Sequence, residues 1–130
     1  MLEQGLTYTA TTTVTEDKTA KVMGSGTLDV FATPAMIALM EEAAYKAVLP
    51  HLDEGMGSVG TYLDVKHLAA TPLGMTVRCE ATLVEIDRRR LVFKVTAFDD
   101  SGVIGEGKHE RFIVNNESFM AKTNAKKGQG

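Results

Sequence analysis

Three polar side chains occur among apolar residues at well-separated points of the chain, and together they could carry out nucleophilic catalysis. Thr33 precedes a long apolar segment, Glu41 lies within that segment, and His67 lies in a later segment of alternating polarity. A hydroxyl, a carboxylate and an imidazole that converge on one pocket have the general layout of a nucleophile and its activating base. The start of a helix nearby would add unpaired N–H groups and a positive dipole end, which stabilise a developing oxyanion.

Each of the three residues also has a structural interpretation, and the sequence leaves both open. Thr33 could be only a helix N-cap, because its hydroxyl can accept a hydrogen bond from an unpaired backbone N–H. Glu41 could be a core carboxylate satisfied by a neighbouring donor, and His67 could be a hydrogen-bonded core histidine. The combination favours catalysis more than any single member does, so we treat the three as candidate catalytic residues.

The segment that carries two of the candidates, residues 30–51, predicts one long helix. Thr33 would be its N-cap, Pro34 its first helical residue, where the missing N–H costs nothing, and Pro50 its end. The segment is apolar on nearly all sides, so we expect other parts of the structure to surround the helix. Glu41 would then lie in the middle of a buried rod and would need a partner or a function.

Five further segments alternate between polar and apolar residues or are rich in strand-forming residues. We predict strands at residues 6–14, 58–69, 75–86, 91–98 and 103–114. In the second of these, His67 shares one face with Leu63 and Val65. In the last, Gly105 and Gly107 predict a bulge or the close approach of another backbone.

The order of these segments predicts the fold class. One strand, one long helix and four strands with short connections leave too few helices for parallel winding. We therefore predict an α+β hot-dog fold, in which an antiparallel sheet curls around one central helix. Free sheet edges favour the pairing of two copies, so we expect a homodimer. The domain would span residues 1–118, and residues 119–130 would form a polar, mobile tail.

Composition excludes several classes of protein. At 130 residues with 44% apolar residues, the chain has the composition of an ordinary soluble globular domain. A net charge of −3 argues against nucleic-acid binding, and the run Arg88–Arg90 fits a solvated hairpin turn better than an anion site.

No signal pattern or membrane-spanning run occurs, so no membrane partner is expected. The single cysteine, Cys79, alternates with apolar residues and predicts a core position, which fits the reducing cytoplasm.

Several separated motifs together resemble the fluoroacetyl-CoA thioesterase type of hot-dog thioesterase. They are VFATPAMIALMEEAA, GSVGT, HLAATPLGMTV and GEGKHER, and their order and spacing are retained across residues 30–111. The resemblance implies a dimer of hot-dog protomers that hydrolyses short acyl-CoA thioesters. It also implies catalytic roles for Thr33 in FAT, Glu41 in LME and His67 in HLAAT, and an acyl-pocket role for Gly60 in GSVGT.

The substrate-binding residues are less well determined by the sequence. Gly60 could instead be needed only to begin its strand. Arg111 is a candidate substrate-binding residue, and both Arg111 and Lys66 are candidate contacts for the phosphates of coenzyme A, although surface ion pairing explains these two equally well. We predict no metal site and no cofactor, since coenzyme A is part of the substrate.

Two departures from the family pattern bear on the substrate. The fluoroacetyl enzyme of the family has bulky aromatic residues just before its FAT block that help to close the acyl pocket, whereas residues 24–28 here read Gly-Ser-Gly-Thr-Leu. Glycine and threonine cannot supply that apolar lid, so we expect little preference for fluoroacetyl-CoA. Glu42 stands where that relative has an apolar residue, and it either points to solvent or enlarges the polar part of the site.

The sequence therefore predicts a short-chain acyl-CoA thioesterase, with partners limited to the acyl-CoA substrate and a second copy of the chain. The first alternative is a non-catalytic acyl-CoA or small-ligand binding protein, because a fold alone does not fix a function. The second is a hot-dog dehydratase that acts on a hydroxyacyl thioester. The identity of the acyl group, and the choice between a covalent and a water-attack route, stay open at this stage.

Overall fold

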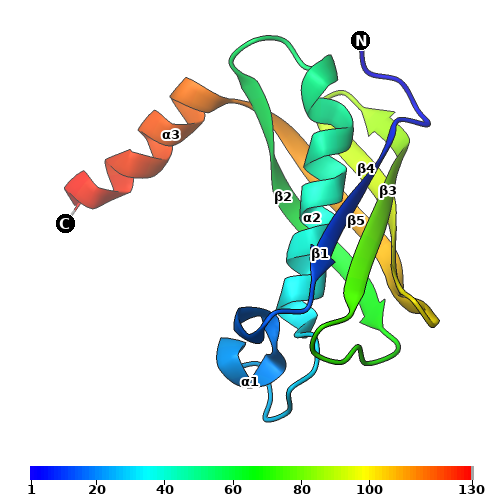
Figure 1. Cartoon of the computed structure of the whole chain (residues 1–130). Coiled ribbons are helices and arrows are strands. Elements are labelled where there is room, and N and C mark those ends of the chain that lie inside the picture. Colours follow the sequence, from blue (N-terminus) through cyan, green and yellow to red (C-terminus); the bar gives the residue numbers. More distant parts are fainter. Residues whose placement is uncertain (130) are drawn as a thin grey trace.

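The computed structural model describes residues 1–129, in which a sheet of antiparallel strands curls around one long helix (Figure 1). The first half of the chain forms β1 (Thr7–Thr13), a 3-10 turn (Glu16–Lys18), α1 (Ala20–Met23), α2 (Thr33–Val48) and a second 3-10 turn (Leu49–His51). The second half forms β2 (Met56–His67), β3 (Thr76–Asp87), β4 (Arg90–Asp99), β5 (Gly102–Asn115), α3 (Asn116–Asn124) and a last 3-10 turn (Ala125–Gln129).

The sheet has the strand order β1-β3-β4-β5-β2, with every neighbouring pair antiparallel. β3 and β4, and then β4 and β5, are joined by tight turns, at which Asp87 pairs with Arg90 and Asp99 with Gly102. β1 and β2 therefore form the two borders of the sheet. The predicted hot-dog fold class, the five strands and the central helix are confirmed.

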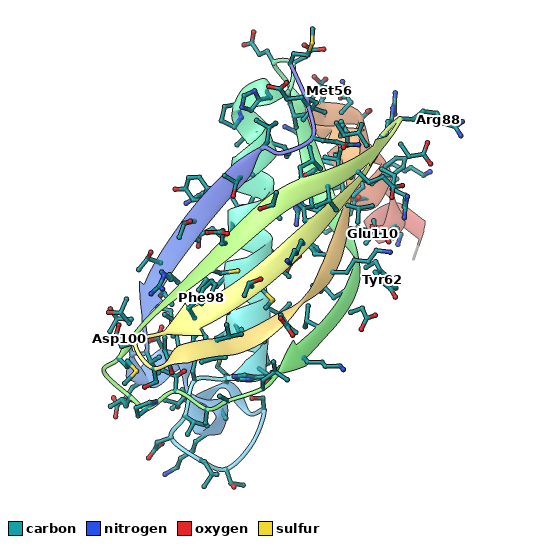
Figure 2. All side chains as sticks on the ribbon, turned by 90° about the vertical axis from the view of Figure 1, so that its right-hand side faces the viewer. Met56, Tyr62, Arg88, Phe98, Asp100 and Glu110 are labelled. Atoms are coloured by element: carbon teal, nitrogen blue, oxygen red, sulfur yellow. The ribbon has the colours of Figure 1, made fainter. Side chains whose placement is uncertain are left out.

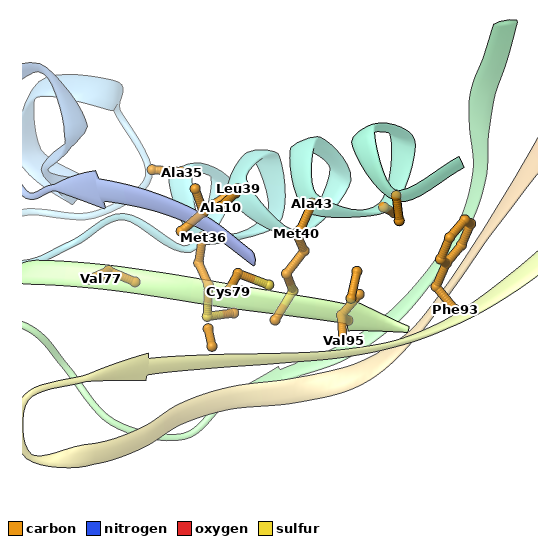
Figure 3. Packing of buried hydrophobic residues seen from close by; sticks show 14 of the residues in the cluster. Ala10, Ala35, Met36, Leu39, Met40, Ala43, Val77, Cys79, Phe93 and Val95 are labelled. Carbon is orange, nitrogen blue, oxygen red and sulfur yellow. The ribbon is translucent and has the colours of Figure 1, made fainter. Parts of the chain in front are cut away.

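One side of α2 packs into the curl of the sheet and forms the core (Figure 3). This side includes Met36, Leu39 and Met40, which meet the inward faces of the strands. The alternation in the sequence identified the inward residues of β3 and β4 correctly, since these side chains are buried: Val77, Cys79, Ala81, Leu83, Leu91, Phe93, Val95 and Ala97. Burial raises the pKa of the Cys79 thiol to about 12, as expected for a core cysteine.

The other side of α2 is uncovered in the protomer, so the expectation of a helix surrounded on all sides is wrong for a single chain. Pro34 and Ala38 are exposed there, and Ile37, Glu41 and Tyr45 are half-buried. The reason is the position of the helix, which packs mainly against β1 and β3 and leaves its side toward β2 open. These side chains form a partly apolar surface on the protomer.

The start of α2 also differs from the prediction. Ala32 is the N-cap residue in an extended conformation, Thr33 is the first helical residue and Pro34 follows it. Ala32 is held in place by the hydrogen bond that its N–H donates to the Lys18 carbonyl, at 2.9 Å. The Thr33 hydroxyl is consequently not used as a cap and is free for another partner.

Two short helices were missed because they lie in polar stretches with weak periodicity. α1 begins at the N-cap Thr19, whose side chain accepts from the Val22 N–H at 3.3 Å. α3 begins at the N-cap Asn115, whose side chain accepts from the Ser118 N–H at 3.0 Å, and it extends away from the body of the molecule (Figure 1). The segment predicted to be a polar, mobile tail, 119–130, is helical as far as it is described. Its mobility stays a prediction, and residue 130 lies outside the described residues.

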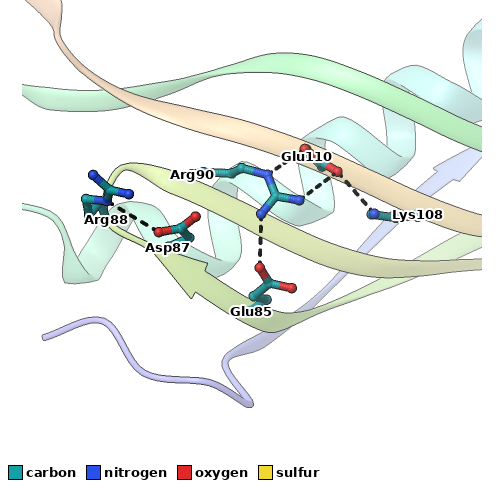
Figure 4. Close-up of polar contacts among 6 residues, drawn as sticks. All are labelled: Glu85, Asp87, Arg88, Arg90, Lys108 and Glu110. Atoms are coloured by element: carbon teal, nitrogen blue, oxygen red, sulfur yellow. Dashed lines mark hydrogen bonds and ion pairs between the residues drawn. The ribbon is translucent and has the colours of Figure 1, made fainter.

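The outer face of the sheet carries charged side chains, and Tyr62 and Glu110 lie there on neighbouring strands (Figure 2). The expectation of a fully solvated turn at Arg88–Arg90 is wrong for Arg90. Its guanidinium donates to Glu110 and to Glu85, each at 2.9 Å, whereas Arg88 is largely exposed (Figure 4). Arg90 already belongs to β4, so its side chain lies along the sheet beside these carboxylates and is only partly exposed.

Gly105 and Gly107 lie where β5 runs against other parts of the structure. A Cβ atom at Gly105 would lie 2.5 Å from Met36 Sδ, and one at Gly107 would lie 2.6 Å from Val65 Cα. The predicted close approach is confirmed, and an irregularity in the pairing of β4 with β5 lies close by, between Ala97 and Phe98. Within residues 1–129, no helix is both long enough and apolar enough to cross a membrane.

Candidate active site

The structure places the Thr33 hydroxyl against the imidazole of His67. Thr33 is the first residue of α2 and His67 is the last residue of β2, and their Oγ1 and Nδ1 atoms are 2.7 Å apart. Two of the three predicted catalytic residues, distant in sequence, are therefore in direct hydrogen-bond contact.

The backbone around this pair is pinned by bonds between segments. The Phe31 N–H donates to the Thr71 carbonyl at 2.9 Å, and Val30 forms a bridge with Pro72. Leu68, next to His67, donates its N–H to the Ile104 carbonyl at 2.6 Å. These bonds hold the chain before α2 against the chain after β2, which fixes the distance between the two side chains.

The electrostatics of His67 suit a base. Partial burial lowers its pKa below the ordinary value of 6.5, more than the Ala69 backbone raises it, so the ring is neutral at pH 7. Its second ring nitrogen, Nε2, is buried and has no hydrogen-bond partner among residues 1–129. A buried polar atom without a partner is costly, so this nitrogen would gain from a hydrogen bond to a bound molecule.

Thr33 and His67 line a cavity of about 290 Å³ at the mouth of the curl. The remaining walls come from the segments on either side of the pair: Ala20, Ser25, Val30, Phe31, Leu68, Ala69 and Ala70. Ser25 belongs to the glycine-flanked loop at residues 24–26, which contributes no aromatic side chain here. The first-turn N–H groups of α2 have no partner within the helix, and they supply the positive end of its dipole beside Thr33.

Glu41 is not part of this contact within one protomer. It lies eight residues beyond Thr33 in α2, which corresponds to a rise of about 12 Å. Its side chain is 40% exposed, so the expectation of a fully buried carboxylate is wrong, and its Oε2 is 3.5 Å from Arg111 Nη1. The structure therefore separates the candidate set into a Thr33–His67 pair and a second cluster around Glu41.

Arg111 lies at the centre of this second cluster, and hydrogen bonds hold its side chain in place. Its side chain is only 8% exposed, and it donates from Nε to Ser58 Oγ and from Nη2 to the Ser58 carbonyl, both at 2.8 Å. This burial places Arg111 beside Glu41, so a role for it in substrate binding stays a prediction. Gly60 adjoins the same cluster, since a Cβ atom there would lie 2.6 Å from Glu41 Oε2. A side chain at position 60 would collide with the carboxylate.

A histidine that the sequence did not single out completes the cluster. His109 is fully buried on β5, with Nδ1 at 2.9 Å from the Tyr62 carbonyl and Nε2 at 3.2 Å from Arg111 Nη1. Its position between two outward-facing charged residues of GEGKHER was the available signal, because alternation on β5 places it on the inner face with Arg111.

Two other charged candidates lie outside both clusters. Glu42 pairs with Lys46 at 2.8 Å, one turn further along α2, and both side chains are more than a third exposed. Lys66 is exposed and lines a shallow groove on the outer face of the sheet together with Lys94 and Glu106. Alternation along β2 thus separates Lys66 from the cavity that its neighbour His67 lines.

A family model and a relative each match most of the chain. The model of the family described as fluoroacetyl-CoA-specific thioesterase matches residues 14–117. A fluoroacetyl-CoA thioesterase from Streptantibioticus cattleyicolor is 45% identical over 102 residues, which are 78% of this chain and 73% of that protein.

Solved structures show the same fold over nearly the whole chain. A fluoroacetyl-CoA thioesterase structure superposes with a TM-score of 0.91 at 38% identity and covers 97% of this chain and 98% of its own. A thioesterase superfamily member from Thermus thermophilus gives a TM-score of 0.91 at 30% identity, with 99% and 96% covered. The similarity therefore extends over nearly the full length of each chain.

Proposed function

The chain belongs to the fluoroacetyl-CoA-specific thioesterase family and is an acyl-CoA thioesterase of hot-dog fold, and we propose that it hydrolyses short-chain acyl-CoA esters to the free acid and coenzyme A. Coenzyme A enters as part of the substrate, so the proposal needs no further cofactor. The reducing cytoplasm, where acyl-CoA esters are made and a lone cysteine stays reduced, is the compartment that we propose.

The observation that carries the proposal is the 2.7 Å contact between Thr33 Oγ1 and His67 Nδ1 at the start of α2. With Nδ1 unprotonated, His67 accepts the hydroxyl proton, and the Thr33 oxygen becomes a nucleophile toward the thioester carbonyl. Negative charge then develops on the carbonyl oxygen, and first-turn N–H groups of α2 are positioned to stabilise it. His67 gives the proton to the departing thiolate of coenzyme A, and a water molecule that His67 then deprotonates attacks the Thr33 ester and releases the free acid.

A second route uses the same residues with water as the nucleophile. His67 removes a proton from a water molecule, Thr33 orients that water, and the acid forms without an acyl-enzyme. Thr33→Ala separates the two routes. The covalent route loses its nucleophile, whereas water attack retains His67 and the helix start and keeps a measurable part of the turnover.

We propose that Glu41 joins a Thr33–His67 pair across a dimer interface. Within one chain the two clusters are about 12 Å apart along α2, and the free border strand β2 and the uncovered side of α2 lie next to Glu41. A two-fold related copy that extends the sheet at β2 would cover Ile37 and Tyr45 and place its own helix opposite. The active sites would then lie between protomers, and a monomer would be incomplete.

The wall of the cavity supports a broad choice of short acyl groups. Residues 24–26 are Gly-Ser-Gly, and Ser25 is the residue of this loop that lines the cavity, so the loop supplies no bulky apolar side chain to close it. The proposal is therefore little preference for fluoroacetyl-CoA over acetyl-CoA. A strong preference for the fluorinated ester would show that another segment closes the pocket.

The test is a panel of short acyl-CoA esters with product analysis. The proposal predicts release of the coenzyme A thiol together with the free acid. Saturable binding without thiol release would indicate a binding protein. An alkene formed from a hydroxyacyl-CoA, with the thioester intact, would indicate a dehydratase.

A further inference from the structure

We propose that His109 is a positioning residue for the acyl-CoA site: as a neutral hydrogen-bond acceptor, it fixes the Arg111 guanidinium beside Glu41 and Gly60. The inference rests on the proposed function, because it concerns residues placed at that site. It assigns to a buried side chain a role that neither the predicted catalytic set nor the proposed mechanism uses.

The hydrogen bonds determine which ring nitrogen of His109 carries the proton. A guanidinium has only donors, so the contact of 3.2 Å requires His109 Nε2 to accept from Arg111 Nη1. The Tyr62 carbonyl has only acceptors, so Nδ1 must donate to it at 2.9 Å. Both conditions hold for one neutral tautomer, in which Nδ1 is protonated and Nε2 is not.

With this tautomer, every nitrogen of the Arg111 guanidinium has a hydrogen-bond acceptor. Nε and Nη2 point to the Ser58 hydroxyl and carbonyl, and Nη1 is shared between His109 at 3.2 Å and Glu41 at 3.5 Å. Without the acceptor on His109, only the carboxylate and solvent would hold Nη1. The bonds to Ser58 would remain, but Nη1 would be held less firmly at the position that it now occupies beside Gly60, where an added Cβ atom would lie 3.5 Å from it.

The charged groups around His109 agree with a neutral ring. Burial lowers its pKa and the positive charge of Arg111 lowers it further, while the Tyr62 backbone and the carboxylates of Glu41 and Glu110 act in the opposite direction. On the remaining side, the ring stacks on Phe93 with centroids 6.2 Å apart. Protonation of Nε2 would set a second donor and a second positive charge against Arg111, so acid should break this bond.

Two substitutions separate the two ends of the ring. In His109→Asn the side-chain amide reaches the Nδ1 position, so the bond to the Tyr62 carbonyl can form but the acceptor for Arg111 is lost. In His109→Gln the amide oxygen reaches the Nε2 position and can still accept from Arg111. We expect His109→Asn to lower kcat/KM for the best short acyl-CoA at least about tenfold, and His109→Gln to stay within about threefold of the parent, because one hydrogen bond to a charged group is lost only in the first.

The proposal also requires that the effect of His109→Asn on kcat/KM depends on Arg111. In an Arg111→Lys background, adding His109→Asn should change kcat/KM by less than about twofold, since residues that act through one contact are not additive. His51→Asn, a half-buried histidine in the turn after α2, is the matched control and should behave like the parent. Equal losses of kcat/KM in His109→Asn and His109→Gln would overturn the proposal, and so would losses from His109→Asn and Arg111→Lys that are additive. Thermal melts would identify variants that lose activity by unfolding.

Nitrogen NMR of the histidine rings tests the same bond without any activity. At pH 7 the His109 ring should show a protonated Nδ1 and an unprotonated Nε2, and the assignment follows from the signal that His109→Gln removes. A ring protonated on Nε2 contradicts the inference even if the enzyme is active. If no acyl-CoA is hydrolysed but the expected tautomer is found, the proposed function has failed while the His109–Arg111 contact stands.

Discussion

At the scale of single residues, the proposed chemistry depends on the pair of Thr33 and His67. Because Ala32 and not Thr33 is the N-cap, removing the Thr33 hydroxyl should not cost the roughly 1 kcal/mol of a lost helix cap. Activity and stability can therefore be separated at this position, which would be difficult for a capping threonine.

We predict that Thr33→Ser retains much of the parent turnover, because it keeps a hydroxyl in contact with His67. Thr33→Ala should lose turnover with a free energy of unfolding close to that of the parent. Thiol release and denaturant unfolding, measured on the same preparations, check both statements. A large destabilisation of Thr33→Ala would mean that the hydroxyl is structural after all.

Glu41→Gln and His67→Ala should each lower kcat by about 10² or more, the lower range for general acid–base groups. Glu41→Gln keeps the shape of the side chain and removes its charge beside Arg111. The double variant should lose far less than the product of the single losses, because the residues act as a unit. Glu42→Gln, at a neighbouring carboxylate paired with Lys46, is the matched control and should retain turnover.

The pH dependence follows from the two partly or fully buried histidines. The pKa values of His67 and His109 are both lowered from 6.5 in the folded protein, chiefly by burial. Below pH 6.5 the unfolded chain binds protons that the folded chain does not, so stability falls as the pH drops from about 6.5 toward the folded pKa values, and it is unaffected by these groups at higher pH. The slope is at most about 1.4 kcal/mol per pH unit for each histidine.

Urea unfolding between pH 7.5 and pH 5 should show this loss, and His109→Gln should reduce it. The acid limb of kcat/KM should have its midpoint below 6.5, because His67 must be neutral to accept a proton. A stability that rises on acidification, or an acid midpoint above 6.5, would contradict the assignment of burial as the dominant effect.

The sequence could identify Thr33, Glu41, His67, Gly60 and Arg111 as candidates, because their types and surroundings are unusual and their motifs resemble one family. It could not show that Glu41 lies beside Arg111 and not beside Thr33. That depends on how α2 is rotated about its axis relative to β2 and β5. It also missed His109, because a histidine between charged residues resembles an exposed one until the strand alternation is combined with the pairing.

At the scale of elements, β5 has to pass close to β2 to hold Arg111 and His109 near Glu41. We predict that Gly107→Ala destabilises the protein by about 1–3 kcal/mol, the usual cost of overpacking, because the new Cβ would lie 2.6 Å from Val65 Cα. Glu106→Ala, an exposed neighbour on the same strand, should change the free energy of unfolding by less than about 0.5 kcal/mol. Equal stabilities in urea unfolding would show that β2 can move away.

The uncovered side of α2 gives a prediction about assembly. Tyr45→Lys should convert the expected dimer into monomers, since a lysine there would place a charge in the apolar surface that a second copy covers. Val103→Lys, an exposed apolar residue beside the turn between β4 and β5, is the matched control and should remain dimeric. Light scattering at micromolar concentration checks both, and a parent protein that is already monomeric would remove the shared-site arrangement.

The elements themselves were largely predictable from the pattern of side chains. β3 and β4 alternate so regularly that their buried faces could be predicted residue by residue. α2 was recognisable from its length and apolar content, but its uncovered side was not. An apolar helix surface that a second copy would cover has the same sequence pattern as one that is buried within a single chain. α1 and α3 depend on single capping residues, Thr19 and Asn115, in polar stretches.

At the scale of the whole molecule, two clusters from different protomers would together form one active site. Each protomer holds a Thr33–His67 pair at one end of α2 and a Glu41–Arg111 cluster in its middle. The open border at β2 lies beside the second cluster, so dimerisation and catalysis would depend on the same surface. This arrangement explains why an apolar helix carries a half-exposed carboxylate on its uncovered side.

A heterodimer with Glu41→Gln in one protomer and His67→Ala in the other tests this central claim most directly. The two chains would be produced together with different purification tags, and the heterodimer would be isolated and assayed for thiol release from its best acyl-CoA. If each site takes Glu41 from one protomer and His67 from its partner, one site carries both substitutions and the other carries none, so turnover returns to about half of the parent value. If all three residues act within one protomer, both sites are damaged, and the heterodimer stays as inactive as either substituted homodimer, which would contradict the shared site.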